Sequence, residues 1–258
     1  MNACRVGILY NQPIPPGEKF SEASLDVLTQ VEAIEDALAK LEYPSARIAF
    51  TRDVGATLDK IALEQAAMVI NLCESVDEDP RYIGHPAAAL ELLGLPFSGS
   101  SSLALMLSTD KTLSKRLLTS AGIGTPGFRE YAGKNTPDVS GLKFPLIAKP
   151  RFQDASIGID QDSVFREEAE LAGKLHALFE QYGPLLLEEY IDGREFNISL
   201  FGFAAPETLP IAEISFDGFP PELFRILGYR AKWDTDSFEY RNSPRVFPCL
   251  SRELNNKL

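Results

Sequence analysis

The chain has 258 residues, of which 45% are hydrophobic and 24% are charged, as in ordinary soluble globular proteins. Its formal net charge of −12 argues against broad nucleic-acid binding, which needs clustered cations that face phosphates. No apolar run reaches membrane-spanning length and no signal-peptide pattern is present, so we expect a cytoplasmic protein with no membrane partner. The cysteines Cys4, Cys73 and Cys249 show neither metal-ligand spacing nor a disulfide pattern.

Strand and helix patterns alternate through the first part of the chain. We expect strands at residues 6–10, 47–50, 67–72 and 96–98, and helices at residues 25–41, 58–66 and 86–93. This alternation predicts an α/β fold that begins with a Rossmann-like parallel sheet domain. Ligands of such sheets bind beyond the carboxyl ends of the strands. Residues 73–80 follow one of these ends and are strongly acidic, so they form either a solvated loop or a substrate contact.

A further helix is predicted at residues 111–120, and Thr109 or Asp110 can cap it. Residues 122–127 formally match the dinucleotide-binding pattern G-x-G-x-x-G. They follow a helix rather than a strand, and Pro126 would interrupt any helix that began there. We therefore interpret them as a helix end and a turn into the next strand.

Residues 144–200 carry the most informative pattern. It reads as a strand, a small-residue loop at 154–158, a helix, and strands at 185–191 and 194–200. Lys149 ends the first strand, where its ammonium would suit a phosphate. Glu188 and Glu189 point to opposite faces of their strand, so only one of them can face a cleft. A strand at 209–214 follows, and a helix begins within 252–258.

Five passages in order resemble the ATP-grasp superfamily, and within it the D-alanine–D-alanine ligase branch. They are Pro96-Phe-Ser-Gly-Ser100 with Ser108-Thr-Asp-Lys111, Leu146-Ile-Ala-Lys149-Pro150, Asp154-Ala-Ser-Ile-Gly158-Ile159, Leu187-Glu-Glu-Tyr-Ile-Asp-Gly-Arg-Glu195, and Ala231-Lys232-Trp233. The resemblance implies an α+β ATP-grasp fold after the first domain. It divides the chain into a pre-ATP-grasp α/β domain at 1–105, a small subdomain at 106–190 and a C-terminally incomplete large subdomain at 191–258.

The same resemblance implies a role for each matched residue in binding ATP. Lys111 and Lys149 would bind phosphates, and Ser156 with neighbouring backbone amides would cover the γ-phosphate as part of a mobile lid. Glu188 would accept from the adenine amino group, the backbone of Glu189 and Ile191 would read the ring edge, and Glu195 would hold the ribose hydroxyls. Lys232 would reach a phosphate from a mobile loop, and Lys232 and Ser156 are the implied catalytic residues.

The implied activity is ligation of a carboxylate to an amine through an acyl phosphate, with ATP and Mg²⁺. The family's metal-binding Asp and its Glu-x-Asn pair find no match after Trp233, so we assign no metal ligands and expect them in an absent C-terminal segment. Asn71-Leu-Cys-Glu-Ser75 replaces the family's His-Gly pair, which leaves both small-molecule substrates unidentified. Two alternatives stay open, a non-catalytic truncated ATP-grasp protein and an α/β binding module; a homodimer is also open.

Overall fold

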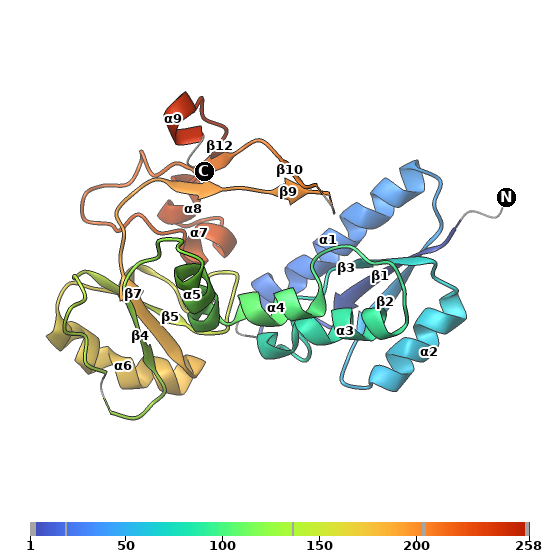
Figure 1. Cartoon of the computed structure of the whole chain (residues 1–258), viewed down its shortest axis with the longest axis horizontal. Coiled ribbons are helices and arrows are strands. Elements are labelled where there is room, and N and C mark those ends of the chain that lie inside the picture. Colours follow the sequence, from blue (N-terminus) through green and yellow to red (C-terminus); the bar gives the residue numbers. More distant parts are fainter. Residues whose placement is uncertain (1–3, 19, 136, 203–204, 256–257) are drawn as a thin grey trace. The chain divides into compact units, whose positions relative to one another are not determined.

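The computed structural model describes residues 4–18, 20–135, 137–202, 205–255 and 258. The chain divides into two units (Figure 1). Unit 1 comprises Met1–Thr125 with Arg151–Asp154, and unit 2 comprises Pro126–Pro150 with Ala155–Leu258. The finer division into three domains at residues 105 and 190 stays a prediction.

A parallel sheet forms the centre of unit 1. Its strands are β1 (Val6–Asn11), β2 (Ser45–Phe50) and β3 (Met68–Asn71), in the order β2-β1-β3. Both pairings are parallel, which confirms the predicted α/β class. The strand expected at 96–98 contributes only one parallel bridge, between Phe97 and Val69.

Helices lie on both sides of this sheet, as Figure 1 shows for α1 and α2. Leu9, Ile48 and Val69 of the sheet pack with Ile61 of α2 and Leu90 of α3 in one buried cluster. The helical elements of unit 1 are α1 (Ser21–Lys40), α2 (Val54–Glu64), η1 (Pro80–Tyr82), α3 (Gly84–Leu92), α4 (Ser102–Thr109) and α5 (Lys111–Ser120).

Side-chain caps set where two of these helices begin. The Asp53 carboxylate accepts from the Ala56 amide at 3.0 Å, so α2 begins four residues before the predicted start at residue 58. Asp110 caps α5 by accepting from the amides of Thr112 and Leu113. Asp110, rather than Thr109, is therefore the cap among the two alternatives.

An antiparallel sheet with a helix on one face forms the first half of unit 2. Its strands are β4 (Phe128–Tyr131), β5 (Leu146–Pro150), β6 (Val164–Phe165) and β7 (Leu185–Glu189), in the order β4-β7-β5-β6. Helix α6 (Glu168–Tyr182) buries Leu171 and Leu175 against Leu146, Ala148 and Leu187. Alternation along β5 turns Ile147 and Lys149 to the opposite face.

The second half of unit 2 corrects one prediction. Residues 194–200 do not form one strand: β8 (Glu195–Asn197) pairs with β11 (Ala212–Ile214), whereas β9 (Leu200–Phe201) pairs with β10 (Glu207–Thr208). Apolar and polar residues alternate without interruption from 195 to 200, so the sequence pattern did not reveal that β8 and β9 pair with different strands. The remaining elements are η2 (Gln161–Ser163), α7 (Tyr229–Trp233), α8 (Phe238–Arg241), β12 (Arg245–Val246) and α9 (Arg252–Asn255). Residues 256 and 257 of the predicted terminal helix lie outside the described residues.

Candidate nucleotide site

Two predicted residues meet directly on the sheet face of unit 2 that α6 does not cover. Strands β5 and β7 are antiparallel, with Ile147 opposite Glu188 and Lys149 opposite Leu186. Lys149 and Glu188 are therefore diagonal neighbours on one face, and their side chains form an ion pair. Both are largely shielded, with exposed side-chain fractions of 27% for Lys149 and 10% for Glu188. The structure thus joins a predicted phosphate ligand to a predicted adenine ligand.

Glu195 adds a second carboxylate to this pair. Partial burial at the start of β8 raises the pKa of Glu195, while the positive charges of Lys232 and Lys149 oppose that rise. Lys232 lies on α7 and is half-buried. Lys149, Glu188, Glu195 and Lys232 are therefore one charged cluster, which we call the unit 2 cluster. The two ammonium groups suit phosphates, and the Glu195 carboxylate suits sugar hydroxyls.

Glu189 points to the other face, as its position next to Glu188 predicts. Its carboxylate accepts from the backbone amides of Gly127 at 3.2 Å and Lys143 at 2.8 Å. Its own amide donates to the Gly127 carbonyl at 3.0 Å. The Glu189 amide is therefore engaged in the sheet, and the predicted contact of the Glu189 and Ile191 backbone with the adenine ring stays a prediction. Ile191, two residues on, is 62% exposed.

The small-residue loop is bonded to the segment that carries Lys232. The Ser156 hydroxyl donates to the Leu227 carbonyl at 2.7 Å, and the Trp233 indole Nε1 donates to the Ala155 carbonyl at 2.9 Å. The Tyr229 amide donates to the Ile159 carbonyl at 2.8 Å. Sequence reasoning missed this link because each bond joins residues 70 or more positions apart. The predicted mobility of the loop stays a prediction.

Lys111 belongs to unit 1, whereas the other predicted ligands belong to unit 2. It begins α5, and its ammonium contacts the backbone carbonyl of Gln153. Arg151 donates to the Asp110 carboxylate at 2.7 and 2.6 Å, which ties residues 151–154 to the start of the same helix. Lys111 therefore has a fixed place within unit 1.

The acidic segment at 73–80 folds against α1 rather than remaining fully solvated. Ser24 donates to the Glu78 carboxylate at 2.9 Å, and Asn11 accepts from the Glu74 amide at 3.2 Å. Partial desolvation, with the nearby negative charge of Asp154, raises the pKa of both Glu74 and Glu78. These carboxylates lie beyond the carboxyl ends of β1 and β3, where ligands of parallel sheets bind.

Neither a metal cage nor a membrane span is found in the part of the chain that the structure describes. No three His, Cys, Asp or Glu side chains group there as a metal ion requires. No helix among the described residues combines the length and apolarity needed to cross a bilayer. Mg²⁺ therefore has no protein cage among these residues.

Comparisons with known proteins place this geometry in context. The family model described as "D-ala D-ala ligase C-terminus" matches residues 126–247, which include the whole unit 2 cluster. The D-alanine–D-alanine ligase of Carboxydothermus hydrogenoformans is 30% identical over 230 residues, which cover 86% of this chain and 69% of that protein. The uncharacterized protein y4sG of Sinorhizobium fredii is 37% identical over 149 residues, which cover 57% of this chain and 43% of that protein.

A solved structure shares the fold over almost the entire chain. The D-alanine–D-alanine ligase of Bacillus anthracis, in its complex with ATP, aligns with a TM-score of 0.71 at 22% identity. The alignment covers 98% of this chain and 74% of that one. The chain thus spans only part of each relative's length, less than half in the case of y4sG.

Proposed function

This chain belongs to the D-alanine–D-alanine ligase family of ATP-grasp proteins, and on that premise we propose that it binds ATP at the unit 2 cluster and uses it to ligate a carboxylate to an amine. The observation that carries the proposal is the Lys149–Glu188 ion pair on the sheet face that α6 does not cover, with the charges of Lys149 and Lys232 also acting on Glu195. A nucleotide presents matching chemistry, with phosphates for the ammonium groups and hydroxyls for the carboxylate.

Each side chain then has a distinct task. Lys149 and Lys232 offset phosphate charge, Glu195 accepts from the ribose hydroxyls, and Glu188 accepts from the adenine amino group. The carbonyl of Glu189 and the backbone of Ile191 line the ring edge, and Ser156 with its neighbouring amides covers the γ-phosphate. The assignment of Lys111 as a phosphate ligand stays a prediction from the sequence. Because Glu188 is ion-paired with Lys149 in the structure, an arriving phosphate competes with Glu188 for that ammonium.

The proposed reaction has two displacements. A substrate carboxylate oxygen attacks the γ-phosphorus of ATP, which forms an acyl phosphate and releases ADP. The amine then attacks the acyl carbon, which forms the amide bond and releases phosphate and a proton. The lysines stabilise charge on the transferring group, and closure of the loop at 154–159 excludes water. Mg²⁺ would offset phosphate charge in such a reaction, but no group of three His, Cys, Asp or Glu side chains among the described residues forms a cage for it.

The substrates are proposed only as a class, an amino acid or other carboxylate and an amine. Asn71-Leu-Cys-Glu-Ser75 differs from the family's His-Gly pair, so D-alanine is not assigned to this chain. Cytoplasmic location and a homodimer stay predictions.

Titration calorimetry with ATP tests the proposed site. Lys149→Ala removes a charge-assisted contact worth about 1.5–3 kcal/mol, so we expect ATP to bind roughly 10- to 150-fold more weakly. Lys174→Ala is the matched control, because Lys174 lies on α6 with 55% of its side chain exposed. Unchanged affinity in Lys149→Ala would refute the site.

The alternative of nucleotide binding without catalysis is separated by a phosphate-release assay. The chain is incubated with ATP, Mg²⁺ and a panel of D- and L-amino acids. Amino-acid-dependent phosphate release supports the ligase. Binding of ATP with no release under any combination supports the non-catalytic alternative.

A further inference from the structure

Helix α7 carries Lys232 but is too short to hold its own position. It has five residues, Tyr229–Trp233, and a helix of this length is unstable without tertiary contacts. The location of the Lys232 ammonium therefore depends on what packs around α7.

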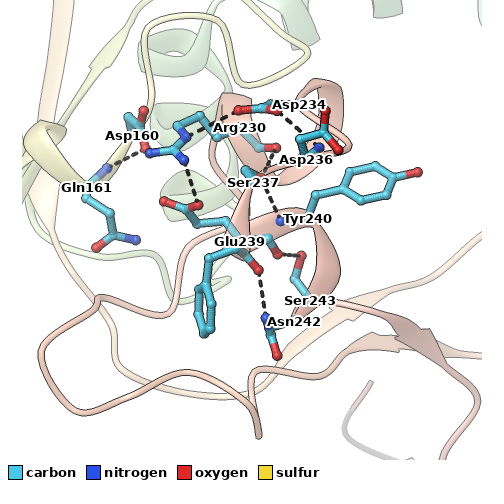
Figure 2. A network of polar contacts seen from close by, with 11 residues as sticks. Asp160, Gln161, Arg230, Asp234, Asp236, Ser237, Glu239, Tyr240, Asn242 and Ser243 are labelled. Carbon is cyan, nitrogen blue, oxygen red and sulfur yellow. Dashed lines mark hydrogen bonds and ion pairs between the residues drawn. The ribbon is translucent and has the colours of Figure 1, made fainter.

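Arg230 of α7 is contacted by Ser237, which caps α8, and by Glu239 of α8 (Figure 2). The Ser237 hydroxyl donates to the Arg230 carbonyl at 3.0 Å and accepts from the Tyr240 amide at 3.0 Å. The Arg230 guanidinium reaches Glu239 through Nη2 at 3.4 Å and Asp234 through Nε at 3.6 Å. Arg230 thus connects α7 to α8 and to the turn between them.

Glu239 makes this connection more than a surface ion pair. Its side chain is only 9% exposed, and its Oε2 has no hydrogen bond from any described residue, so the Arg230 guanidinium is the cation that faces it. A buried carboxylate without a counter-charge is strongly unfavourable. Moving Arg230 away from Glu239 would therefore be costly, which restrains the helix that carries Arg230.

The restraint acts on the side of α7 away from Lys232. Residues two positions apart in an α-helix are separated by roughly 200° around the axis. Arg230 pairs with Glu239, whereas the positive charge of Lys232 acts on Glu195 of the unit 2 cluster. Trp233, one residue on, donates to the Ala155 carbonyl at 2.9 Å and fixes the end of α7 to the small-residue loop.

We propose that Arg230 and Glu239 are a positioning pair that sets the place of the Lys232 ammonium, and thereby its contact with the terminal phosphates of a bound nucleotide. The proposal rests on the proposed function for its ligand. Neither residue touches the nucleotide; both act through Lys232.

The test compares ATP with AMP, because Lys232 is assigned to phosphates that AMP lacks. In Glu239→Gln and in Arg230→Gln we expect ATP to bind about five- to tenfold more weakly. Binding of AMP stays unchanged. In a Lys232→Ala background neither substitution weakens ATP binding further, and Arg230→Lys retains part of the wild-type affinity.

Asp236→Asn is the control, since the Asp236 side chain is 93% exposed and pairs with Arg241. Equal losses for ATP and AMP, or losses that persist without Lys232, would reduce the pair to a structural role and overturn the proposal.

A second measurement needs no nucleotide. The rate of amine labelling at Lys232, followed by mass spectrometry on the folded free chain, reports the environment of its ammonium. We expect a several-fold change in Glu239→Gln at Lys232 and none at Lys174. An unchanged rate at Lys232 overturns the proposal. If wild-type chain fails to bind ATP while this rate changes, the proposed function fails and the positioning pair stands.

Discussion

Gly158 shows how one residue shapes the loop of the candidate site. Its φ is +73°, in the left-handed region, and a Cβ there would lie 2.7 Å from Cγ of Pro150. Pro150 ends β5 directly after Lys149, so the loop folds back onto the strand that carries this predicted phosphate ligand. Only glycine satisfies both the backbone angle and the close approach.

We therefore expect Gly158→Ala to destabilise the chain by about 1–3 kcal/mol, from backbone strain and overpacking together. Urea denaturation measures the change. The control is Gly173→Ala within α6, where a Cβ meets no atom within 4 Å. Because alanine favours helix interiors, that variant should gain roughly 0.5–1 kcal/mol. Equal effects at the two positions would contradict the argument.

At the scale of elements, hydrogen bonds join the small-residue loop to the segment that carries α7. Three hydrogen bonds connect residues 155–159 with residues 227–233: Ser156 donates to Leu227, Tyr229 to Ile159, and Trp233 to Ala155. Ala155 and Ser156 hold φ angles of 49° and 61°, a conformation that non-glycine residues adopt only when surrounding contacts fix it. The bonds to residues 227–233 supply that fixation.

Hydrogen exchange should reveal this coupling. The Tyr229 amide, which donates to Ile159, should be protected in the free chain. Trp233→Phe removes the bond to Ala155 and should accelerate exchange at both Ile159 and Tyr229, while the amides of α6 keep their rates. Acceleration at only one of the two amides would show that the loop and the helix open independently.

Sequence reasoning succeeded where the cause was local. The Asp110 cap, the α/β alternation and the opposite orientations of Glu188 and Glu189 follow from neighbouring residues. The Lys149–Glu188 pair did not, because it depends on the register of two strands far apart in the chain. The same holds for Trp233 and Ala155, which are separated by 78 positions.

Across the whole molecule, the pKa values of carboxyl groups are shifted in two opposite directions. Partial desolvation raises the pKa of Glu74, Glu78 and Glu195, and the nearby charge of Asp154 adds to the rise at Glu74 and Glu78. Arginine or backbone partners lower the pKa of another set, which includes Glu35, Asp79, Asp110 and Glu213. Carboxyl groups with a lowered pKa stabilise the fold at pH values above their unfolded-state pKa. This contribution to the free energy of unfolding is lost as the pH falls. The raised group is stabilising only when protonated, so its contribution is lost as pH rises above about 4.5.

Stability should therefore pass through a maximum in mildly acidic solution. Glu74→Gln removes one raised carboxyl, so the variant should lose less stability between pH 5 and pH 8. Because water partly screens Glu74, we expect a gain of only about 1–2 °C in Tm at pH 7. Calorimetry across pH measures it, with Glu180→Gln as control because Glu180 is 66% exposed. A variant curve parallel to that of the wild type would contradict the assignment.

The hydrogen bond from Trp233 to Ala155 also allows this junction to be followed by intrinsic tryptophan fluorescence. Trp233 is the single tryptophan of the sequence, so all indole fluorescence originates at the junction of the loop and α7. The partly enclosed ring should emit at shorter wavelengths than free tryptophan, and separation of the loop from α7 should shift emission to the red. Stopped-flow fluorescence can then time the opening of this junction with no label attached.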